Sequence, residues 1–194
     1  MADPKLIMKL RVDTGAGIVD CQKVLEEAGG DYDKAVDLLR KKGQKVAANK
    51  QDRETREGIV HAYTHANGRV GALVEMLCET DFVARNEDFK ALAHDIALQI
   101  AATNPLYVKP EDVPAEVIEK EREIYKEQMA GENKPEEIKN KIITGKLAKY
   151  YQEVCLLKQP FIKDDSLTVE QLLTQMIAKV GENIQIRRFS RFAL

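Results

Sequence analysis

The hydrophobic period of the sequence changes at Gly58, and the stretch that follows constrains the fold most. From there the period is two: Ile59, His61 and Tyr63 alternate with Val60, Ala62 and Thr64, Asn67-Gly68 follows, and a return stretch runs from Arg69 to Cys78. Period two is typical of a β-strand, and Asn-Gly is the strongest two-residue hairpin signal. The second stretch is partly apolar on both faces, so we expect a central strand that is covered at least in part on each side.

The residues before this hairpin predict three short helices. The loop Thr14–Gly17 separates the first two, and Gly29-Gly30 ends the second. Asp31 is placed to cap the third helix, which Gly43 is expected to end. We therefore expect a three-helix bundle like a ubiquitin-associated domain over residues 1–43, and a polar linker or exposed helix over residues 44–57.

Helical periodicity returns after the hairpin. The apolar stripe of the first helix consists of Phe89, Leu92, Ala93, Ile96, Ala97 and Ile100, and Asn86 is its expected N-cap. Two densely charged helices after Pro114 and Pro135 predict a helical hairpin, and Thr168 with Gln171 fits a capping box. The tail, residues 184–192, looks like a strand. The expected fold class is α+β: the helical bundle, then an α+β core over residues 58–194 in which a small antiparallel sheet packs with helices.

The charge balance argues against a protein that binds nucleic acid by overall attraction. The chain has 30 Lys and Arg against 32 Asp and Glu, a net charge of -2, whereas phosphate binding needs a concentrated positive field. Arg187, Arg188 and Arg191 interleave with Phe189 and Phe192, which superficially resembles an RNA-binding strand. We prefer a terminal strand with its aromatic side chains inward and its arginines outward.

Cysteine usage and hydropathy indicate a soluble, cytoplasmic protein. The three cysteines, Cys21, Cys78 and Cys155, lie far apart without a CxxC pair, which indicates reduced thiols instead of disulfides or a zinc site. The start, MADPKLIMKLR, has no cleavage signature. No run approaches the roughly 18 apolar residues that span a bilayer.

A search for catalytic or cofactor chemistry finds little. Gly15-Ala16-Gly17 lacks the GxGxxG spacing and the GK[ST] ending and follows a helix, so it predicts a tight turn between helices. His61 and His65 share a strand face, but four residues separate them by roughly 13 Å, too far to share one metal ion. His94 has no visible nucleophile partner. We expect no catalytic residue, no cofactor and no metal.

The stretch LCETDFVARNEDF, Leu77 to Phe89, places Phe82 and Val83 among charged residues. Neither Asn86 nor Thr80 as an N-cap gives a hydrophobic staple that includes Phe82. From the residues alone, burial of Phe82 in the chain's own core and exposure as an anchor for a partner carry equal weight. An aromatic side chain that projects from a rigid corner ringed by charges is what an interface hot spot requires.

Two long motifs resemble the bacterial translation elongation factor Ts family. The N-terminal stretch LRVDTGAGIVDCQKVL resembles the family pattern LRxxTGAGMMDCKKAL, and ETDFVARNEDF resembles the pattern TDFVA[KR]N that follows the hairpin. The resemblance continues through QPFIKDD to the tail and so covers essentially the whole chain. Ile18-Val19 stands where many members have Met-Met, which keeps an apolar contact but loses the adaptability of methionine.

The resemblance implies a nucleotide exchange factor for elongation factor Tu, the GTPase that delivers aminoacyl-tRNA to the ribosome. In the family, the TDFVA corner enters the G domain of the partner. Carried onto this sequence, Phe82 is the wedge and Asp81 its polar neighbour, and together they disturb the partner's Mg²⁺ and phosphate site so that GDP leaves. The partner-binding residues implied are Thr80, Asp81, Phe82, Val83, Ala84, Arg85 and Asn86 in the corner, and Arg11, Ile18 and Val19 in the helical head.

The length resembles that of the short family members. Long members carry a duplicated core subdomain, whereas this chain has one hairpin and one terminal strand, and short members act as homodimers. We therefore expect a homodimer formed through the domain at residues 58–194. Two other functions remain open from the residues: an adaptor with a ubiquitin-associated-like head, and a hydrolase that uses His94 or His61.

Overall fold

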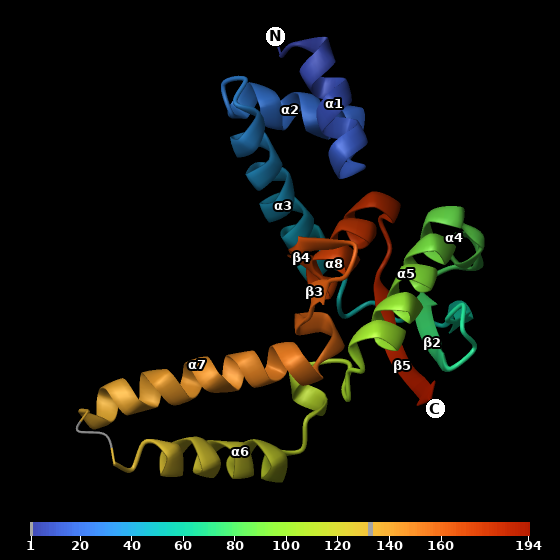
Figure 1. The fold of residues 1–194 in the computed structure, drawn as a ribbon. Helices are drawn as coiled ribbons and strands as arrows, with labels where there is room; N and C mark the ends of the chain where they lie inside the picture. Colours follow the sequence, from blue (N-terminus) through green and yellow to red (C-terminus); the bar gives the residue numbers. More distant parts are fainter. Residues whose placement is uncertain (1, 132–133) are drawn as a thin grey trace.

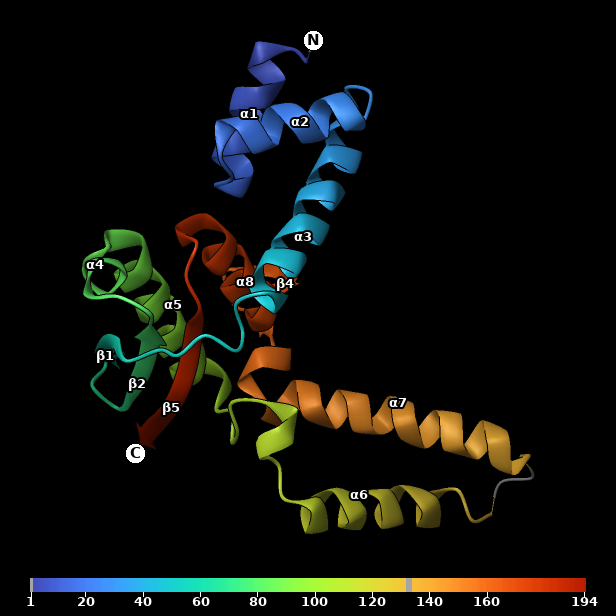
Figure 2. The same ribbon diagram turned by 180° about the vertical axis from the view of Figure 1, so that it is seen from behind.

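The computed structural model describes residues 2–131 and 134–194, and it shows an α+β protein (Figure 1). A helical head at the N-terminus stands above a small sheet with its covering helices, and a helical hairpin extends away on the opposite side, as the reverse view also shows (Figure 2). The predicted fold class is confirmed.

The head consists of α1 (Pro4–Thr14), α2 (Ile18–Glu27) and the first part of α3 (Tyr32–Ala48). Asp3 and Asp31 cap α1 and α3 through their side chains, and Gly15 ends α1 in the left-handed conformation at φ 68°. The hydrophobic core of the head is formed by Leu10, Cys21, Val24, Leu25 and Ala35. The tight turn predicted between the first two helices is confirmed.

The prediction that Gly43 ends the third helix is wrong. Helix α3 continues to Ala48, because its second half packs against α8 (Val169–Val180). A Cβ atom placed on Gly43 would lie 3.6 Å from the Cβ atom of Ala178, so glycine serves here as a small residue at a helix–helix contact. Tertiary packing has overridden the weak helix propensity of glycine.

The sheet has the order β1-β2-β5 and is antiparallel throughout. Its strands are β1 (Glu57–Thr64), β2 (Val70–Cys78) and β5 (Ile184–Ala193). The hairpin predicted at Asn67-Gly68, the central position of the second strand and the terminal strand are all confirmed. Gly68 has φ 67°, which the tight turn requires.

The two faces of the sheet differ in their covering. Helix α5 (Glu87–Thr103) packs against β1 and β2, and α8 packs against β5. Val74 and Met76 are fully buried on this face. Among the described residues no element covers the opposite face, where Val60 is 64% exposed and Leu73 44%. The expected covering on each side of β2 is therefore wrong for the single chain.

The hairpin of charged helices is confirmed as α6 (Ala115–Gln128) and α7 (Glu136–Val154). Its thin seam has a separate buried cluster, Met129, Ile143 and Leu147. Asn86 caps α5, and Thr168 with Gln171 forms the capping box of α8, both as predicted. No helix in the described part of the chain is long and apolar enough to cross a membrane.

Several short elements were not predicted. They are α4 (Asp81–Arg85), β3 (Pro160–Phe161), β4 (Asp164–Thr168) and two 3₁₀ turns, Pro110–Asp112 and Leu156–Lys158. The β3–β4 hairpin is fixed to α5 through buried Gln99. The Gln99 Nε2 donates to Gln159 Oε1 at 3.2 Å, and the Ile162 backbone N–H donates to Gln99 Oε1 at 2.8 Å. Hydrogen bonds of this kind carry no periodic sequence signal.

Candidate partner-binding site

The sharp connection from β2 to α5 contains the one-turn helix α4, and we call residues Thr80–Asn86 the corner. Thr80 caps α4, its Oγ1 accepting from the Val83 N–H at 3.5 Å. Asn86 ends α4 and caps α5, its Oδ1 accepting from the Asp88 N–H at 2.8 Å. Two capped helices in direct succession leave this segment few alternative conformations.

The side chains of the corner divide sharply by exposure. Phe82 is 81% exposed, whereas Val83 and Ala84 are 8% and 7% exposed and pack into the main core. Burial of Val83 and Ala84 fixes the turn of helix from which the Phe82 ring projects. The structure thus places Phe82 on the surface, and the alternative that it belongs to the chain's own core is wrong.

Glu182, in the turn between α8 and β5, holds the start of the corner. Its carboxylate accepts from the Thr80 Oγ1 hydroxyl at 2.6 Å and from the Thr80 and Glu79 backbone N–H groups at 3.0 and 3.2 Å. Charge-assisted bonds of this type are stronger than neutral ones. Sequence reasoning missed Glu182, because its partners lie more than 100 positions away.

A second residue of the same turn, the buried Asn183, ties the corner to the connection that precedes β1. The Asn183 N–H donates to Glu79 Oε1 at 2.6 Å, and its Nδ2 donates to the carbonyl oxygens of Gln51 and Arg53. Asn183 is 2% exposed, so these bonds are shielded from water. The corner, the 51–53 segment and the α8–β5 turn form one hydrogen-bonded unit.

Charged residues of the corner interact only on its surface. Arg85 Nη2 lies 3.0 Å from Asp81 Oδ2 in an i,i+4 pair whose side chains are 78% and 44% exposed. Solvent-exposed pairs of this kind contribute little to stability. Asp81 therefore remains close to Phe82 as an accessible carboxylate.

Beneath the corner, Cys78 is buried and stays a thiol. Its Sγ–H donates to the Thr80 carbonyl oxygen at 3.1 Å. Burial, with a further contribution from the Glu182 charge, raises the pKa of Cys78 to about 11. A thiolate is thus disfavoured at neutral pH, and Cys78 acts as a small packed residue.

The head exposes a second set of apolar side chains. Ile18 and Val19 are 46% and 58% exposed, and Arg11 is exposed nearby in sequence. Met8 and Val12, one turn apart on the outer side of α1, are 51% and 77% exposed. The exposure of Met8 and Val12 was not predicted. It could have been, because both are apolar residues that lie off the helix face formed by Leu6, Ile7 and Leu10. We call Met8, Val12, Ile18 and Val19 the head patch.

Comparison of the sequence with known proteins shows the family of this chain. The family model described as Elongation factor TS matches residues 22–175. This chain belongs to the elongation factor Ts family. It is 58% identical over 189 residues to the elongation factor Ts of Thermotoga petrophila, an alignment that spans 97% of this chain and 94% of the relative.

Two further relatives carry the same name. The elongation factor Ts of Carboxydothermus hydrogenoformans is 55% identical over 194 residues, which cover 100% of this chain and 89% of the relative. That of Syntrophus aciditrophicus is 51% identical over 189 residues, which cover 97% and 94%. The likeness therefore extends through the head, the corner and the terminal strand of this family member.

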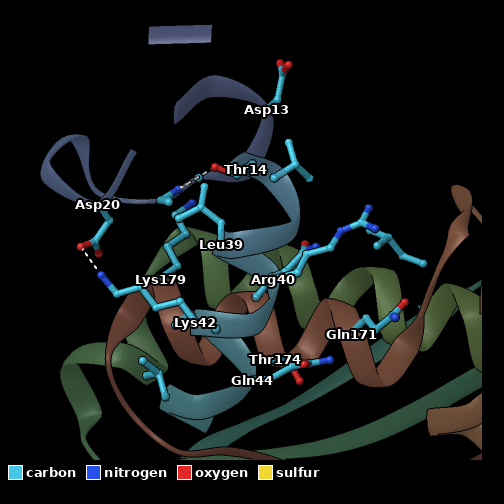
Figure 3. Close-up of a pocket in the computed structure, with 18 of the residues that line it drawn as sticks. Asp13, Thr14, Asp20, Leu39, Arg40, Lys42, Gln44, Gln171, Thr174 and Lys179 are labelled. Atoms are coloured by element: carbon cyan, nitrogen blue, oxygen red, sulfur yellow. Dashed lines mark hydrogen bonds and ion pairs between the residues drawn. The ribbon is translucent and has the colours of Figure 1, made fainter. Parts of the chain in front are cut away.

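A pocket of about 360 Å³ lies between the head and α8 of this elongation factor Ts chain (Figure 3). The loop that contains Gly15, the second half of α3 and the outer side of α8 line it. Two of its lysines are already paired: Lys42 with Asp20 at 2.5 Å and Lys179 with Asp88 at 2.8 Å. Both lysines are thus engaged within the fold, and the loop of Gly15 joins two helices, so it lacks the strand-to-helix setting of a P-loop.

The histidine that lies nearest to His61 is not the one that was considered from the sequence. The pair considered there was His61 with His65, but His61 Nε2 lies 3.3 Å from His94 Nδ1, and His65 Nδ1 lies 3.1 Å from the Tyr63 hydroxyl. Burial and the neighbouring His94 lower the pKa of His61. In the described part of the chain, no group of three or more His, Cys, Asp or Glu residues could hold a metal ion.

The arginines of the terminal strand are engaged within the fold. Arg187 and Arg188 both donate to the Glu75 carboxylate, at 2.9 and 2.5 Å, and Arg191 Nε donates to the Ala101 carbonyl oxygen at 3.0 Å. Phe189 is half-buried against the core, whereas Phe192 is 73% exposed. The preferred terminal strand is confirmed, but two side-chain positions expected in it are wrong. Phe192, expected inward, lies on the open face of the sheet opposite Gly71. Arg191, expected outward, lies on the covered face opposite Ala72, where it bonds to α5.

Proposed function

We propose that this chain promotes the release of GDP from elongation factor Tu during translation elongation by inserting Asp81 and Phe82 near the partner's Mg²⁺ and phosphate site. The observation that carries the proposal is the 81% exposure of the Phe82 ring on a doubly capped corner. A protein whose function is to expose this ring needs no bond-breaking chemistry. The proposed activity is therefore not enzymatic and needs no cofactor or metal of its own.

Stiffness of the corner supports the proposed insertion. A flexible loop would lose conformational entropy on insertion, whereas a segment that is already fixed loses little. Burial of a phenylalanine ring in a partner pocket contributes about 2–4 kcal/mol, as interface hot spots do. By linkage, this factor and GDP must weaken each other's binding to the partner by the same factor.

The head provides a second proposed contact with the G domain, through Arg11, Ile18 and Val19. Val12, next to Arg11 in the sequence, is 77% exposed, the most of the head patch. The head and the corner both lie in the upper part of the view of Figure 1, whereas the α6–α7 hairpin extends to the lower left, away from them. One partner could thus reach both contacts, which would raise the local concentration of the corner at its target.

We further propose that two copies of the chain associate through the open face of the sheet. The side chains of Val60, Leu73 and Phe192 are exposed on this face. The solvent-facing side of an antiparallel sheet is usually polar, so exposed apolar side chains there are unusual. Exposed apolar side chains grouped on one face, here beside the Glu75–Arg188 ion pair, mark an interaction site. Residues 1–43 would then act as a separate docking domain joined through residues 44–57, and residues 58–194 as the core and dimerisation domain.

The proposed partner also determines the expected localisation of this chain. Elongation factor Tu works in the cytoplasm, so this chain is placed there, with no direct role for nucleic acid or a membrane. The test is a release assay in which elongation factor Tu carries a fluorescent GDP and unlabelled GDP is in excess. Addition of the chain should accelerate the loss of fluorescence in proportion to its concentration. An unchanged release rate with folded protein would overturn the proposed function.

A further inference from the structure

Two of the three histidines of the chain, His61 and His94, meet at the outer edge of the core, and the third, His65, contacts Tyr63. His61 and His65 come from β1, which forms an edge of the sheet, and His94 comes from α5, which packs across it. His61 Nε2 and His94 Nδ1 face each other at 3.3 Å, and one of them carries the shared proton. The proposed exchange activity uses none of these side chains.

The separation of the two nitrogens matches a shared metal ion. Two imidazole nitrogens bound to one tetrahedral zinc ion at about 2.0–2.1 Å lie about 3.3–3.4 Å from each other. Their rings meet edge to face, with centroids 5.4 Å apart and an interplanar angle of 84°. The proton now between them would shift to the other nitrogen of its own ring.

The surroundings hold His94 in place. The Tyr63 ring packs edge to face on the His94 ring with centroids 5.6 Å apart. The Tyr63 hydroxyl in turn forms a hydrogen bond with His65 Nδ1. Ligands fixed by neighbouring rings on a paired strand and a long helix lose little freedom when they bind an ion.

We infer that His61 and His94 form a binding site for a divalent transition-metal ion of the zinc class, with water in the remaining coordination positions. Imidazole suits zinc, copper and nickel, and it disfavours magnesium and calcium, which prefer oxygen. No third His, Cys, Asp or Glu joins the pair within the described ranges, so the ion keeps open positions. The ion would fasten the edge strand β1 to α5, the helix that begins at the corner.

The chain offers a matched control. His65 is an exposed histidine on the same strand, two residues beyond Tyr63, and it does not contact His61 or His94. His94 is exposed, so His94→Ala should fold normally. All three cysteines are buried, which removes the competing thiol sites in the folded protein.

The test is a titration of the untagged, chelator-treated full chain with Zn²⁺ at about pH 7.5, where imidazoles are mostly neutral. Calorimetry should give one ion per chain, and side-chain nitrogen NMR should show shifts for His61 and His94 but not for His65. His61→Ala and His94→Ala should each weaken binding at least about tenfold, the effect expected on losing one of two ligands. His65→Ala should bind as the unmodified chain does.

Thermal unfolding gives a second readout. Zn²⁺ should raise the unfolding midpoint of the unmodified chain and of His65→Ala, but not that of His94→Ala, because a ligand that binds the native state stabilises it. Unchanged affinity in His94→Ala would overturn the inference. So would several weak equivalents that perturb all three histidines alike, which would indicate an adventitious ion only.

Discussion

The Thr80 hydroxyl donates a hydrogen bond of 2.6 Å to Glu182, across 102 positions of sequence. The same carboxylate accepts from the Thr80 backbone N–H, so it holds the residue that caps α4 by its side chain and its main chain together. Phe82 lies two residues further on. Its orientation therefore depends on a glutamate in a turn that belongs to the other end of the chain.

Replacement of Glu182 should reduce exchange while the fold persists. Glu182→Ala leaves two backbone N–H groups and a hydroxyl without their acceptor, which destabilises the chain by about 1–3 kcal/mol and loosens the corner. We expect a several-fold loss in the rate of GDP release from elongation factor Tu at sub-saturating factor. Stopped-flow fluorescence of labelled GDP measures it.

Glu170→Ala provides the control for this change. Glu170 also forms a charged contact, with Lys158 at 2.7 Å, but its side chain is half exposed and far from the corner in sequence. It should leave exchange unchanged. Equal exchange rates for the Glu182 and Glu170 variants would show that the corner keeps its orientation without the carboxylate.

Phe82→Ala should nearly abolish exchange with no cost to folding. The ring makes little contact with its own chain, since it is 81% exposed, so the unfolding midpoint should not fall. Loss of a hot-spot ring worth about 2–4 kcal/mol corresponds to tens- to hundreds-fold slower exchange at equal factor concentration. Leu106→Ala removes another exposed apolar side chain, 61% exposed, and should retain full activity. Near-normal exchange by folded Phe82→Ala would exclude the wedge.

The sequence predicts those parts of the fold that rest on local signals. Period-two alternation with Asn67-Gly68 gives the hairpin, the stripe from Phe89 to Ile100 gives α5, and the capping box gives the start of α8. Gly43 shows the limit, because a residue that usually ends a helix is needed here for contact with Ala178. Tertiary contacts decide such positions.

The sequence also predicts only part of the candidate site. The residues alone left the position of Phe82 undecided, and exposure emerged only once Val83 and Ala84 were seen to be buried. Glu182 could not be predicted, since its hydrogen bonds join segments that share no motif. The contact between His61 and His94 likewise arises from the packing of α5 on β1, which no spacing in the sequence encodes.

Acid should weaken the pairing of β2 with β5. Hydrogen bonds from Arg188 and then Arg187 lower the pKa of Glu75 below its ordinary value near 4.5. A lowered folded-state pKa gives stability that is present above the unfolded pKa and disappears as pH falls through the folded one. Glu75→Gln should therefore be less stable than the unmodified chain at neutral pH. The difference should shrink as pH falls below the ordinary value near 4.5 and vanish below the lowered folded-state pKa.

Urea unfolding at one fixed protein concentration, from neutral pH to about pH 3, measures this difference. A Glu75→Gln deficit that stays constant across the pH range would mean that the carboxylate stabilises the strand pair by its shape and not by its charge.

Thiol reagents should not modify the native protein at mildly alkaline pH. Cys21, Cys78 and Cys155 are all buried, and burial raises the pKa of Cys78 and of Cys155 to about 11. Few thiolates exist and none is accessible, so reaction requires opening of the fold. Absorbance with an aromatic disulfide reagent should show near-zero reaction in buffer and three thiols in denaturant. Rapid reaction of one thiol in buffer would contradict the packing around it.

A charge at the centre of the open sheet face should separate the proposed dimer. Leu73 lies on the central strand, opposite Ala62 of β1 and Ser190 of β5, and its side chain is 44% exposed. Within one chain, Leu73→Lys moves an ammonium into water and should cost little. Between two copies it would bury that charge without a partner, which is strongly unfavourable.

Light scattering after size exclusion at micromolar concentration should thus show a dimer for the unmodified chain and a monomer for Leu73→Lys. Leu106→Lys, at an exposed position outside the sheet, should remain dimeric. A monomeric unmodified chain would show that the face stays open in solution. If the Leu73→Lys monomer keeps its full exchange rate per chain, the corner and the head act without a second copy, because a single chain then already holds the whole partner-binding surface.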